Sequence, residues 1–488
     1  MARRILFLTL PCWIVCILVL LASAARLLAQ GSAQPAKLLV KNAVILTMAT
    51  GHQEPVRGYL LVGEGGRLIA VSAGDPPASA RAQQVLDAGG HWIIPGFISA
   101  HSHLWQSAFR GLAANQTLPG WITALYTDTA SKARPEDFYW FTLDGALDHL
   151  QHGVTAAYNF NYGGAGSYSD TSTGPTLASF EENEFRAEMD SGLRFVHGYQ
   201  IGKYGPGYLT EDARKPLKAF IAWTAAQPKS AAFLSIMLNG GTAFNNTYQQ
   251  AVMEKALMEE FHLGNETHYL EPPETAGEEQ SKFRWMMDSG LLSRNLIFGH
   301  FIHTNSFILA QTAKAGASMS WNPLSNGRLA SGVADIPAYL KAGIRVGMGV
   351  DGEASADLAD PFENMRTGLY AIRDKYEDAT IMSPYDVLRL HTMGSADVLG
   401  VADRLGSLEP GKLADFLVVD PSRFGPIFDT YASLVFIADE RDLERVYVGG
   451  ELMVLKGALV KRDAAKVKEE VNKRVAALRQ ADRASDHE

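Results

Sequence analysis

Short apolar runs alternate with longer amphipathic stretches through the middle of the chain. The apolar runs have the length of buried strands, and the amphipathic stretches have the length and the polar face of helices. Helix-start signals separate several of the runs, since Pro135 opens a segment predicted to end at Gln151 and Ser383-Pro384 opens another. This alternation predicts repeated β-α units and a parallel sheet.

The middle region is predicted to contain eight strands. Their expected last residues are Ala100, Asn159, His197, Leu238, His268, His300, Trp321 and Asp351. Eight consecutive β-α units close into a barrel of the TIM-like (β/α)8 type. We therefore expect an α/β fold in which residues 95–403 form the barrel.

The two ends of the chain share a different pattern. Residues 37–94 and 404–460 contain short alternating runs broken by Gly and Asn, which are typical of strands joined by tight turns. We expect both ends to fold together as a small β-sandwich domain. The charged, alanine-rich residues 461–488 are predicted to form a C-terminal helical tail.

The first thirty residues differ from the rest of the chain. Arg3 and Arg4 precede an apolar run over residues 5–21, which is followed by small residues. This is the pattern of a secretory signal peptide, with cleavage after Ala24 or Ala29. The alternative is an uncleaved membrane anchor, because about 20 apolar residues span a bilayer. We expect an exported protein, periplasmic or secreted, or one anchored to the membrane by this segment.

Composition and charge narrow the class of partner. With 488 residues and 47% hydrophobic content, the chain can bury a large core. Its formal net charge is -9, and no long Lys/Arg run occurs, so we exclude nucleic acid as a main partner. The expected partner is a small molecule, and contact with a membrane is expected only through the N-terminal segment. A homo-oligomer is an open option.

A pair of histidines is the first candidate for chemistry. His101 and His103 are two residues apart in a predicted strand, so both side chains point to one side and can reach one metal ion. Two histidines alone are a weak signal, because two unrelated surface imidazoles give the same pattern.

Later strand ends strengthen the hypothesis. His268, with Glu271 three residues on, His300 and Asp351 end or follow three other predicted strands. Taken singly, each histidine could be a core residue and Asp351 could be a helix cap. Active sites of such barrels lie at the carboxyl ends of the strands, so all of these residues are expected on one face. Together they predict one active site.

Several motifs resemble the amidohydrolase superfamily over residues 38–460. They are residues 95–98 (Pro-Gly-Phe-Ile) before the paired histidines, the stretches 101–107 and 325–332, and residues 406–415 near the end. The closest resemblance is to the aminohydrolase and chlorohydrolase branch, with its 8-oxoguanine deaminase-like, triazine hydrolase-like and S-adenosylhomocysteine deaminase-like members.

The resemblance implies a role for each candidate residue. It implies that one divalent metal ion, Zn²⁺ or alternatively Fe²⁺ or Mn²⁺, is bound by His101, His103, His268 and Asp351. It also implies that Glu271 transfers protons, that His300 assists, and that Asp351 orients the attacking water. Members with two metals use a lysine on the fourth strand, but our candidate at 231–238 has none and Lys229 precedes it.

Two further residues are candidates for substrate binding. Gln106 could hydrogen-bond the edge of a flat heterocycle, or it could be an ordinary solvated amide. Trp321 stands where relatives often have histidine or cysteine. Its indole could form a wall of the pocket or pack behind it.

Three functions follow in order of preference. The first is hydrolytic deamination of a nitrogen heterocycle such as a purine, pterin or triazine. The second is cleavage of a cyclic or linear amide, as in imidazolonepropionase-like relatives. The third is a non-catalytic binding protein on the same fold, whose sign would be a missing ligand or base, and none is missing here.

Overall fold

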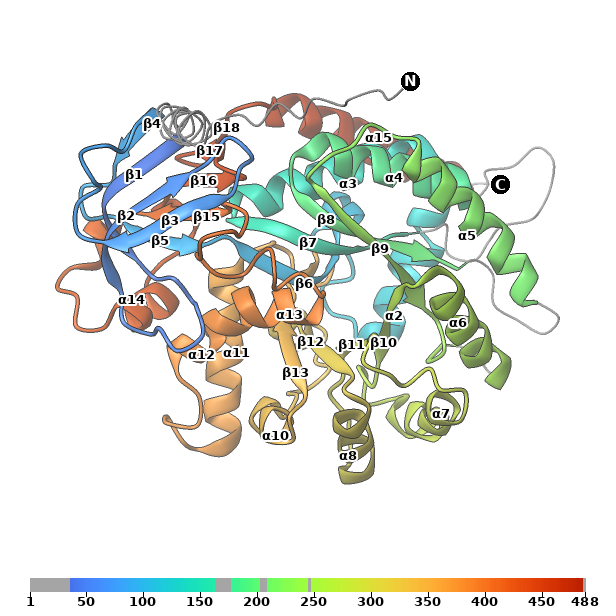
Figure 1. Cartoon of the computed structure of the whole chain (residues 1–488). Helices are drawn as coiled ribbons and strands as arrows, with labels where there is room; N and C mark the ends of the chain where they lie inside the picture. Colours follow the sequence, from blue (N-terminus) through green and yellow to red (C-terminus); the bar gives the residue numbers. More distant parts are fainter. Residues whose placement is uncertain (1–35, 163–176, 202–208, 245–246, 486–488) are drawn as a thin grey trace, which may run out of the picture.

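The computed structural model describes residues 36–162, 177–201, 209–244 and 247–485 (Figure 1). The segment 1–30, predicted as a signal peptide or anchor, lies outside the described residues. Among the described residues, no helix is long and apolar enough to cross a membrane.

A barrel of eight parallel strands occupies the middle of the chain. The first seven are β6 (Phe97–His103), β7 (Val154–Phe160), β8 (Arg194–Gln200), β9 (Phe233–Gly240), β10 (Gly264–Tyr269), β11 (Leu296–His300) and β12 (Ser318–Trp321). The eighth is interrupted, as β13 (Arg345–Met348) and β14 (Asp351–Gly352). The barrel closes where Asp351 of β14 pairs with Ser102 of β6. The predicted (β/α)8 fold is confirmed, with strand ends within a few residues of those expected.

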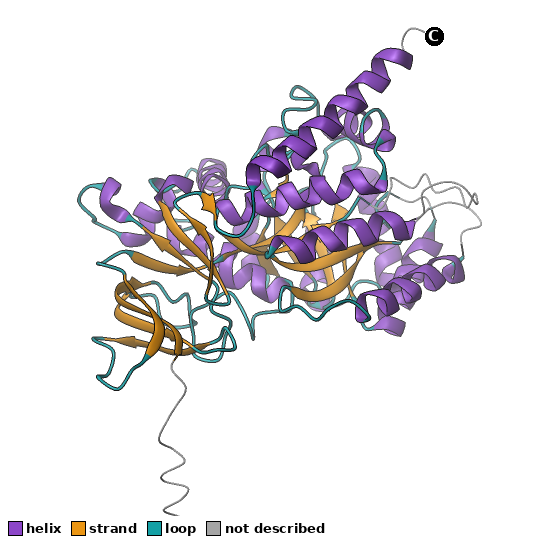
Figure 2. Ribbon diagram, turned by 90° about the horizontal axis from the view of Figure 1, so that it is seen from above, coloured by secondary structure: helices purple, strands orange, loops and turns teal. Residues whose placement is uncertain are grey.

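Helices cover the outside of the barrel (Figure 2). The larger ones are α3 (Pro135–Gln151), α4 (Leu177–Ser191), α5 (Thr210–Ala225), α6 (Tyr248–Phe261), α7 (Ala276–Asp288), α8 (Ser306–Ala315) and α11 (Pro361–Tyr376). Shorter helices elsewhere in the described chain are α2 (Leu118–Ile122), α9 (Pro323–Arg328), α10 (Ile336–Lys341), α12 (Pro384–Arg389), α13 (Ser395–Val398) and α14 (Thr430–Phe436). The last helix, α15 (Ala464–Ser485), packs on α3. The bounds of α3 are those predicted, and α12 begins at the Ser383-Pro384 signal.

A second sheet, set to one side of the barrel in Figure 2, combines both ends of the chain. Its strands are β1 (Ala36–Ile45), β2 (Val56–Val62), β3 (Leu68–Ala73), β4 (Ala82–Asp87), β5 (Trp92–Pro95), β15 (Phe416–Val419), β16 (Leu443–Val448), β17 (Glu451–Leu455) and β18 (Ala458–Leu459). The ends meet where β5 pairs antiparallel with β15. Because β1 pairs with β2, β4 and β5, hydrogen bonds join the strands into one branched sheet.

A buried ion pair connects the barrel to this sheet. Arg194 of β8 donates through Nε and one terminal nitrogen to the two carboxylate oxygens of Asp415, at 2.6 and 2.8 Å. The backbone N–H of Gly449, in the β16–β17 turn, donates to the same carboxylate at 2.7 Å. Asp415 ends the family-like stretch 406–415, so that stretch has a structural role at this junction.

The carboxyl end of the barrel has unusual backbone geometry. His300 and Asp351 adopt left-handed conformations, with φ of 66° and 61°. Such conformations cost a non-glycine residue about 1–3 kcal/mol and cluster at functional sites. At Gly349, a Cβ would lie 2.6 Å from the carbonyl oxygen of His101. Glycine therefore lets the eighth strand approach the first, which brings Asp351 close to the paired histidines.

Candidate active site

A cavity of about 570 Å³ opens at the carboxyl ends of the barrel strands. Five of the predicted site residues line it: His103, His268, Glu271, His300 and Asp351. His101 lies immediately beneath, fully buried. All six predicted catalytic and ligating residues therefore lie together at the expected end of the barrel.

The imidazoles and the carboxylate converge on one point. Nε2 of His103 lies 3.1 Å from Nε2 of His268, and Oδ1 of Asp351 lies 3.5 Å from Nε2 of both His101 and His103. Two overlapping groups have their ligand atoms within 4.8 Å of one another, namely His101, His103 and Asp351, and His101, His268 and His300. His101, His103, His268 and Asp351, which these groups contain, offer the nitrogen and oxygen donors of protein zinc sites.

Hydrogen bonds on the far side of each ring aim the nitrogens at this point. Nδ1 of His101 lies 2.5 Å from Oε1 of Glu266, and Nδ1 of His103 lies 3.0 Å from the carbonyl oxygen of Phe160. Since both Nδ1 atoms donate to oxygens, both Nε2 atoms present lone pairs to the centre. Nε2 of His101 is buried and has no hydrogen-bond partner. An unpaired buried acceptor of this kind fits a divalent cation.

His300 is oriented in the opposite sense. The side-chain amide of Asn326 donates to Nδ1 of His300 at 2.7 Å. The ring proton is then on Nε2, which lies 3.6 Å from Glu271 Oε2 and 3.7 Å from Asp351 Oδ2. His300 therefore offers a donor to the cavity, where His101 and His103 offer acceptors.

Glu271 is the acid nearest to this donor. Only 2% of the residue is exposed, and Ser331 donates to its Oε1 at 3.4 Å. Burial, assisted by the negative charge of Asp351, raises the pKa of Glu271 well above its usual range. A carboxyl group with a raised pKa suits proton transfer near neutral pH.

The site concentrates negative charge around His101. Burial alone lowers the pKa of this histidine, but the carboxylates of Glu266 and Asp351 raise it to about 10. In the absence of a cation, a proton on His101 would balance these acids. A divalent cation bound at the same point would supply that balance in place of the proton.

The two residues predicted to bind substrate lie elsewhere. Trp321 is 1% exposed and belongs to the hydrophobic core, where a Cβ at Gly368 would lie 2.6 Å from its ring. Gln106 is fully buried. Neither is among the described residues that line the cavity. The pocket-wall interpretation of Trp321 is therefore wrong, because its indole packs behind the site, and Gln106 is not a solvated amide.

The structure adds three residues that the sequence analysis did not assign. Glu266 orients His101, Asn326 orients His300, and Ser331 holds Glu271. Glu266 precedes His268 by two positions in β10, so strand alternation places both side chains on the same side. That spacing was a usable signal. Asn326 and Ser331 fall in the family-like stretch 325–332, whose polar residues were left without roles.

The fourth barrel strand fits a single metal. β9 contains no lysine, and Lys229 precedes it. This agrees with the prediction of one metal ion.

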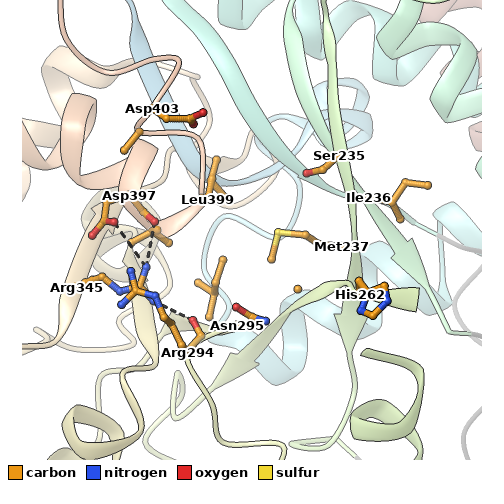
Figure 3. Close-up of a pocket in the computed structure, with 15 residues that line it drawn as sticks. Ser235, Ile236, Met237, His262, Arg294, Asn295, Arg345, Asp397, Leu399 and Asp403 are labelled. Atoms are coloured by element: carbon orange, nitrogen blue, oxygen red, sulfur yellow. Dashed lines mark hydrogen bonds and ion pairs between the residues drawn. The ribbon is translucent and has the colours of Figure 1, made fainter. Parts of the chain in front are cut away.

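A second cavity, of about 540 Å³, opens at the amino-terminal end of the barrel (Figure 3). There the Arg345 guanidinium donates to three backbone carbonyls, those of Arg294, Gly316 and Asp397. These bonds of Arg345 tie the amino-terminal end of the barrel together, whereas the predicted site residues line the cavity at the opposite end.

A closed parallel barrel with a cluster of histidines and acids at its carboxyl end has the layout of a barrel enzyme with its active site at that end. A family model described as the amidohydrolase family matches residues 92–453. The chain belongs to the amidohydrolase family and is a hydrolase of that family, as the sequence predicted.

Curated relatives share most of their length with this chain. The 5-methylthioadenosine/S-adenosylhomocysteine deaminase of Desulforudis audaxviator is 30% identical over 431 residues, which cover 86% of this chain and 93% of the relative. The enzyme of the same name from Bacillus thuringiensis is 26% identical over 425 residues, covering 85% and 93%.

Solved structures share the fold. An adenosine deaminase from Xanthomonas campestris with bound zinc superposes with a TM-score of 0.78 at 21% identity, covering 92% of this chain and all of that one. Atrazine chlorohydrolase from Arthrobacter aurescens TC1, complexed with zinc, gives 0.77 at 21% identity, covering 90% of this chain and all of that one. At these identities the likeness shows the fold alone.

Proposed function

We propose that this protein is a mononuclear metal-dependent aminohydrolase that removes an amino group from a nitrogen heterocycle by hydrolysis. One observation supports the proposal above the others. The Nε2 lone pairs of His101 and His103 point at the same place that the Nε2–H of His300 and the carboxyl of Glu271 face from the cavity side. The hydrogen bonds thus assign the residues to two roles: His101 and His103 present lone pairs for a cation, and His300 presents a proton.

Each residue has a defined task in this reaction. His101, His103, His268 and Asp351 would hold the cation, which supplies Lewis-acid activation of a water molecule when bound. Glu271 accepts a proton from the attacking water and delivers it to the leaving nitrogen. The Nε2–H of His300 donates a hydrogen bond to the group under attack. Asp351, whose Oδ2 lies 3.7 Å from His300 Nε2, orients the water and would also be a ligand of the cation.

The cavity favours a flat substrate. Trp121, Tyr126, Phe160, Tyr162 and Phe244 contribute aromatic side chains to its lining. Aromatic walls bind planar rings through offset stacking and apolar contact. The related deaminases named above act on adenosine derivatives, so an aminopurine compound is the first substrate class to test.

We further propose zinc as the metal and export as the destination of the protein. The donor set of three histidines and one aspartate suits zinc, with Fe²⁺ and Mn²⁺ as the alternatives. Export is proposed on the basis of the sequence of residues 1–30. N-terminal sequencing of the protein from a native membrane-free fraction would test it. A chain beginning near residue 25 or 30 is expected, and an intact Met1 would contradict cleavage.

Ammonia release tests the reaction itself. The metal-loaded protein is incubated with aminopurine nucleosides, aminopurine bases, aminotriazines and cyclic amides, and ammonia is measured by a coupled assay. We expect one ammonia per product from a heterocycle, and no release after metal removal by a chelator. Ring opening without ammonia would instead indicate an amide hydrolase. A protein that binds these compounds but turns none over would be a binding protein.

A further inference from the structure

Tyr126 belongs to the wall of the active-site cavity. It lies in η2 (Thr123–Thr127), a π-helical segment, and it lines the cavity together with Asp351. π-helical segments are rare and frequently mark functional sites.

Three aromatic rings hold the Tyr126 ring in place. Trp105 meets it edge-on at a centroid distance of 5.3 Å, Trp121 meets it edge-on at 6.0 Å, and Tyr162 stacks on it at 5.9 Å. The indole N–H of Trp121 donates to the carbonyl oxygen of Ala354 at 2.9 Å. The wall that contains Tyr126 is therefore tied to the loop that follows Asp351.

Gln106 lies behind this tyrosine. Its side chain is fully buried, and neither amide atom has a hydrogen bond of regular geometry. A Cβ at Gly352 would lie only 1.9 Å from Oε1 of Gln106, so the amide packs directly against the backbone next to Asp351. An unpaired buried amide costs about 1–3 kcal/mol. Its persistence beside the reacting centre calls for a functional explanation.

The chain at Gln106 passes next to Tyr126, because the ring of the preceding residue, Trp105, lies 5.3 Å from the Tyr126 ring. The Gln106 amide acts on the Tyr126 phenol. Burial raises the pKa of this phenol, so it stays protonated at working pH, while its interaction with Gln106 acts in the opposite direction by stabilising negative charge on the oxygen. An amide N–H that approaches the phenol oxygen leaves the O–H free to donate elsewhere. Hydrogen bonds of this kind are often long without substrate and tighten when substrate binds.

We propose that Tyr126 is a specificity-determining residue whose hydroxyl donates a hydrogen bond to a ring nitrogen of the substrate, and that Gln106 positions this hydroxyl. The inference rests on the proposed function and deepens it. It assigns to Tyr126 the heterocycle contact that Gln106, outside the cavity lining, does not make. It also defines the substrate class, namely a flat heterocycle with an unprotonated ring nitrogen on the side that faces η2.

Equilibrium binding tests this inference separately from turnover. The metal-loaded Glu271→Gln variant is titrated with adenosine and with analogues in which one ring nitrogen at a time is replaced by C–H. We expect one analogue to bind about tenfold more weakly than adenosine, the scale of one lost hydrogen bond. Adding Tyr126→Phe should weaken adenosine binding and bring that ratio to within about twofold, because the donor is gone.

A second variant tests the positioning role. Gln106→Met removes the amide at similar volume, so it should lower the same affinity ratio while leaving the thermal midpoint unchanged or higher, since an unpaired buried amide is lost. Tyr139→Phe is the matched control, because its hydroxyl bonds Asp190 in an exposed position away from the cavity. It should leave the ratio unchanged.

The outcomes separate the two proposals. The inference is overturned if all analogues bind equally when Tyr126 is present, or if none binds at all. It is also overturned if the affinity ratio between adenosine and the weakest analogue is unchanged in Tyr126→Phe. The affinity ratio between adenosine and the analogue could depend on Tyr126 while the protein with Glu271 intact releases no ammonia. That result would support the inference and overturn the proposed function.

Discussion

Nδ1 of His101 and Oε1 of Glu266 lie 2.5 Å apart, and both side chains are fully buried. The two residues come from β6 and β10, which are not adjacent in the barrel sheet. This contact selects the tautomer of His101 and increases the electron density on its Nε2. A carboxylate in this position is the outer partner that ligating histidines commonly use.

Replacing this carboxylate should weaken metal binding. In Glu266→Gln the negative charge disappears while the shape remains, so His101 becomes a poorer ligand. We expect metal affinity to fall by about 10–100-fold, measured by competition with a chromogenic chelator. Glu259→Gln is the control, because Glu259 is exposed and pairs only with Lys255 among its described ion pairs. An affinity equal to that of the unmodified protein would remove Glu266 from this role.

Glu271→Gln should separate metal binding from turnover. The amide keeps the volume of the carboxyl but cannot transfer a proton, so we expect one equivalent of metal and a fall in kcat of at least about two orders of magnitude. Metal content is measured by atomic emission and kcat by ammonia release. Rates close to those of the unmodified protein would exclude Glu271 as the proton-transfer group.

The sequence was sufficient to place the candidate ligands at one end of the barrel. Strand ends can be located from apolar runs, and the barrel geometry then collects His101, His103, His268 and Asp351 on one face without further information. The same reasoning placed α3 at its observed bounds, because a proline start signal and a glycine stop signal flank it.

Side-chain contacts across the barrel could not be predicted from local sequence patterns. The pairing of Glu266 with His101 depends on how far opposite strands are staggered, and no local pattern encodes that. Gln106 and Tyr126 lie in short irregular helices, η1 (Leu104–Phe109) and η2, where neither helical nor strand periodicity indicates which side faces the cavity. The sequence left two places open for Trp321 for a related reason, since alternation along a four-residue strand cannot distinguish the pocket from the core.

His300 is predicted to be required for turnover and dispensable for the metal. Its Nε2 carries the proton when Asn326 donates to Nδ1, so it cannot also offer a lone pair to a cation. His300→Asn should retain one equivalent of metal and lose at least about two orders of magnitude in kcat. Asn326→Leu should lower kcat in the same direction by less, because the ring remains but its tautomer is no longer selected. Loss of metal from His300→Asn would show that His300 is a ligand.

The junction between the barrel and the second sheet should depend on Asp415. Removing this carboxylate leaves the Arg194 guanidinium buried without its charged partner, which typically costs about 3–5 kcal/mol. Asp415→Ala should therefore lower the thermal midpoint substantially, as measured by calorimetry. Asp403→Ala is the control, because its side chain is 77% exposed and a change of no more than about 0.5 kcal/mol is expected there. Equal midpoints for the two variants would contradict a structural role of the ion pair.

His152 should make stability fall at alkaline pH. Burial alone lowers its pKa, but Asp148, whose carboxylate lies 3.4 Å from Nδ1, raises it to about 9 from the ordinary 6.5. Because the folded pKa exceeds the ordinary value, this contribution to stability is fully present below about pH 6.5 and is lost as pH rises through about 9. Thermal midpoints measured between about pH 6 and about pH 10 should fall more steeply in the unmodified protein than in His152→Asn. His52→Asn, which alters an exposed histidine, should follow the unmodified curve. Parallel curves for the unmodified protein and His152→Asn would show that the pair with Asp148 does not stabilise the fold.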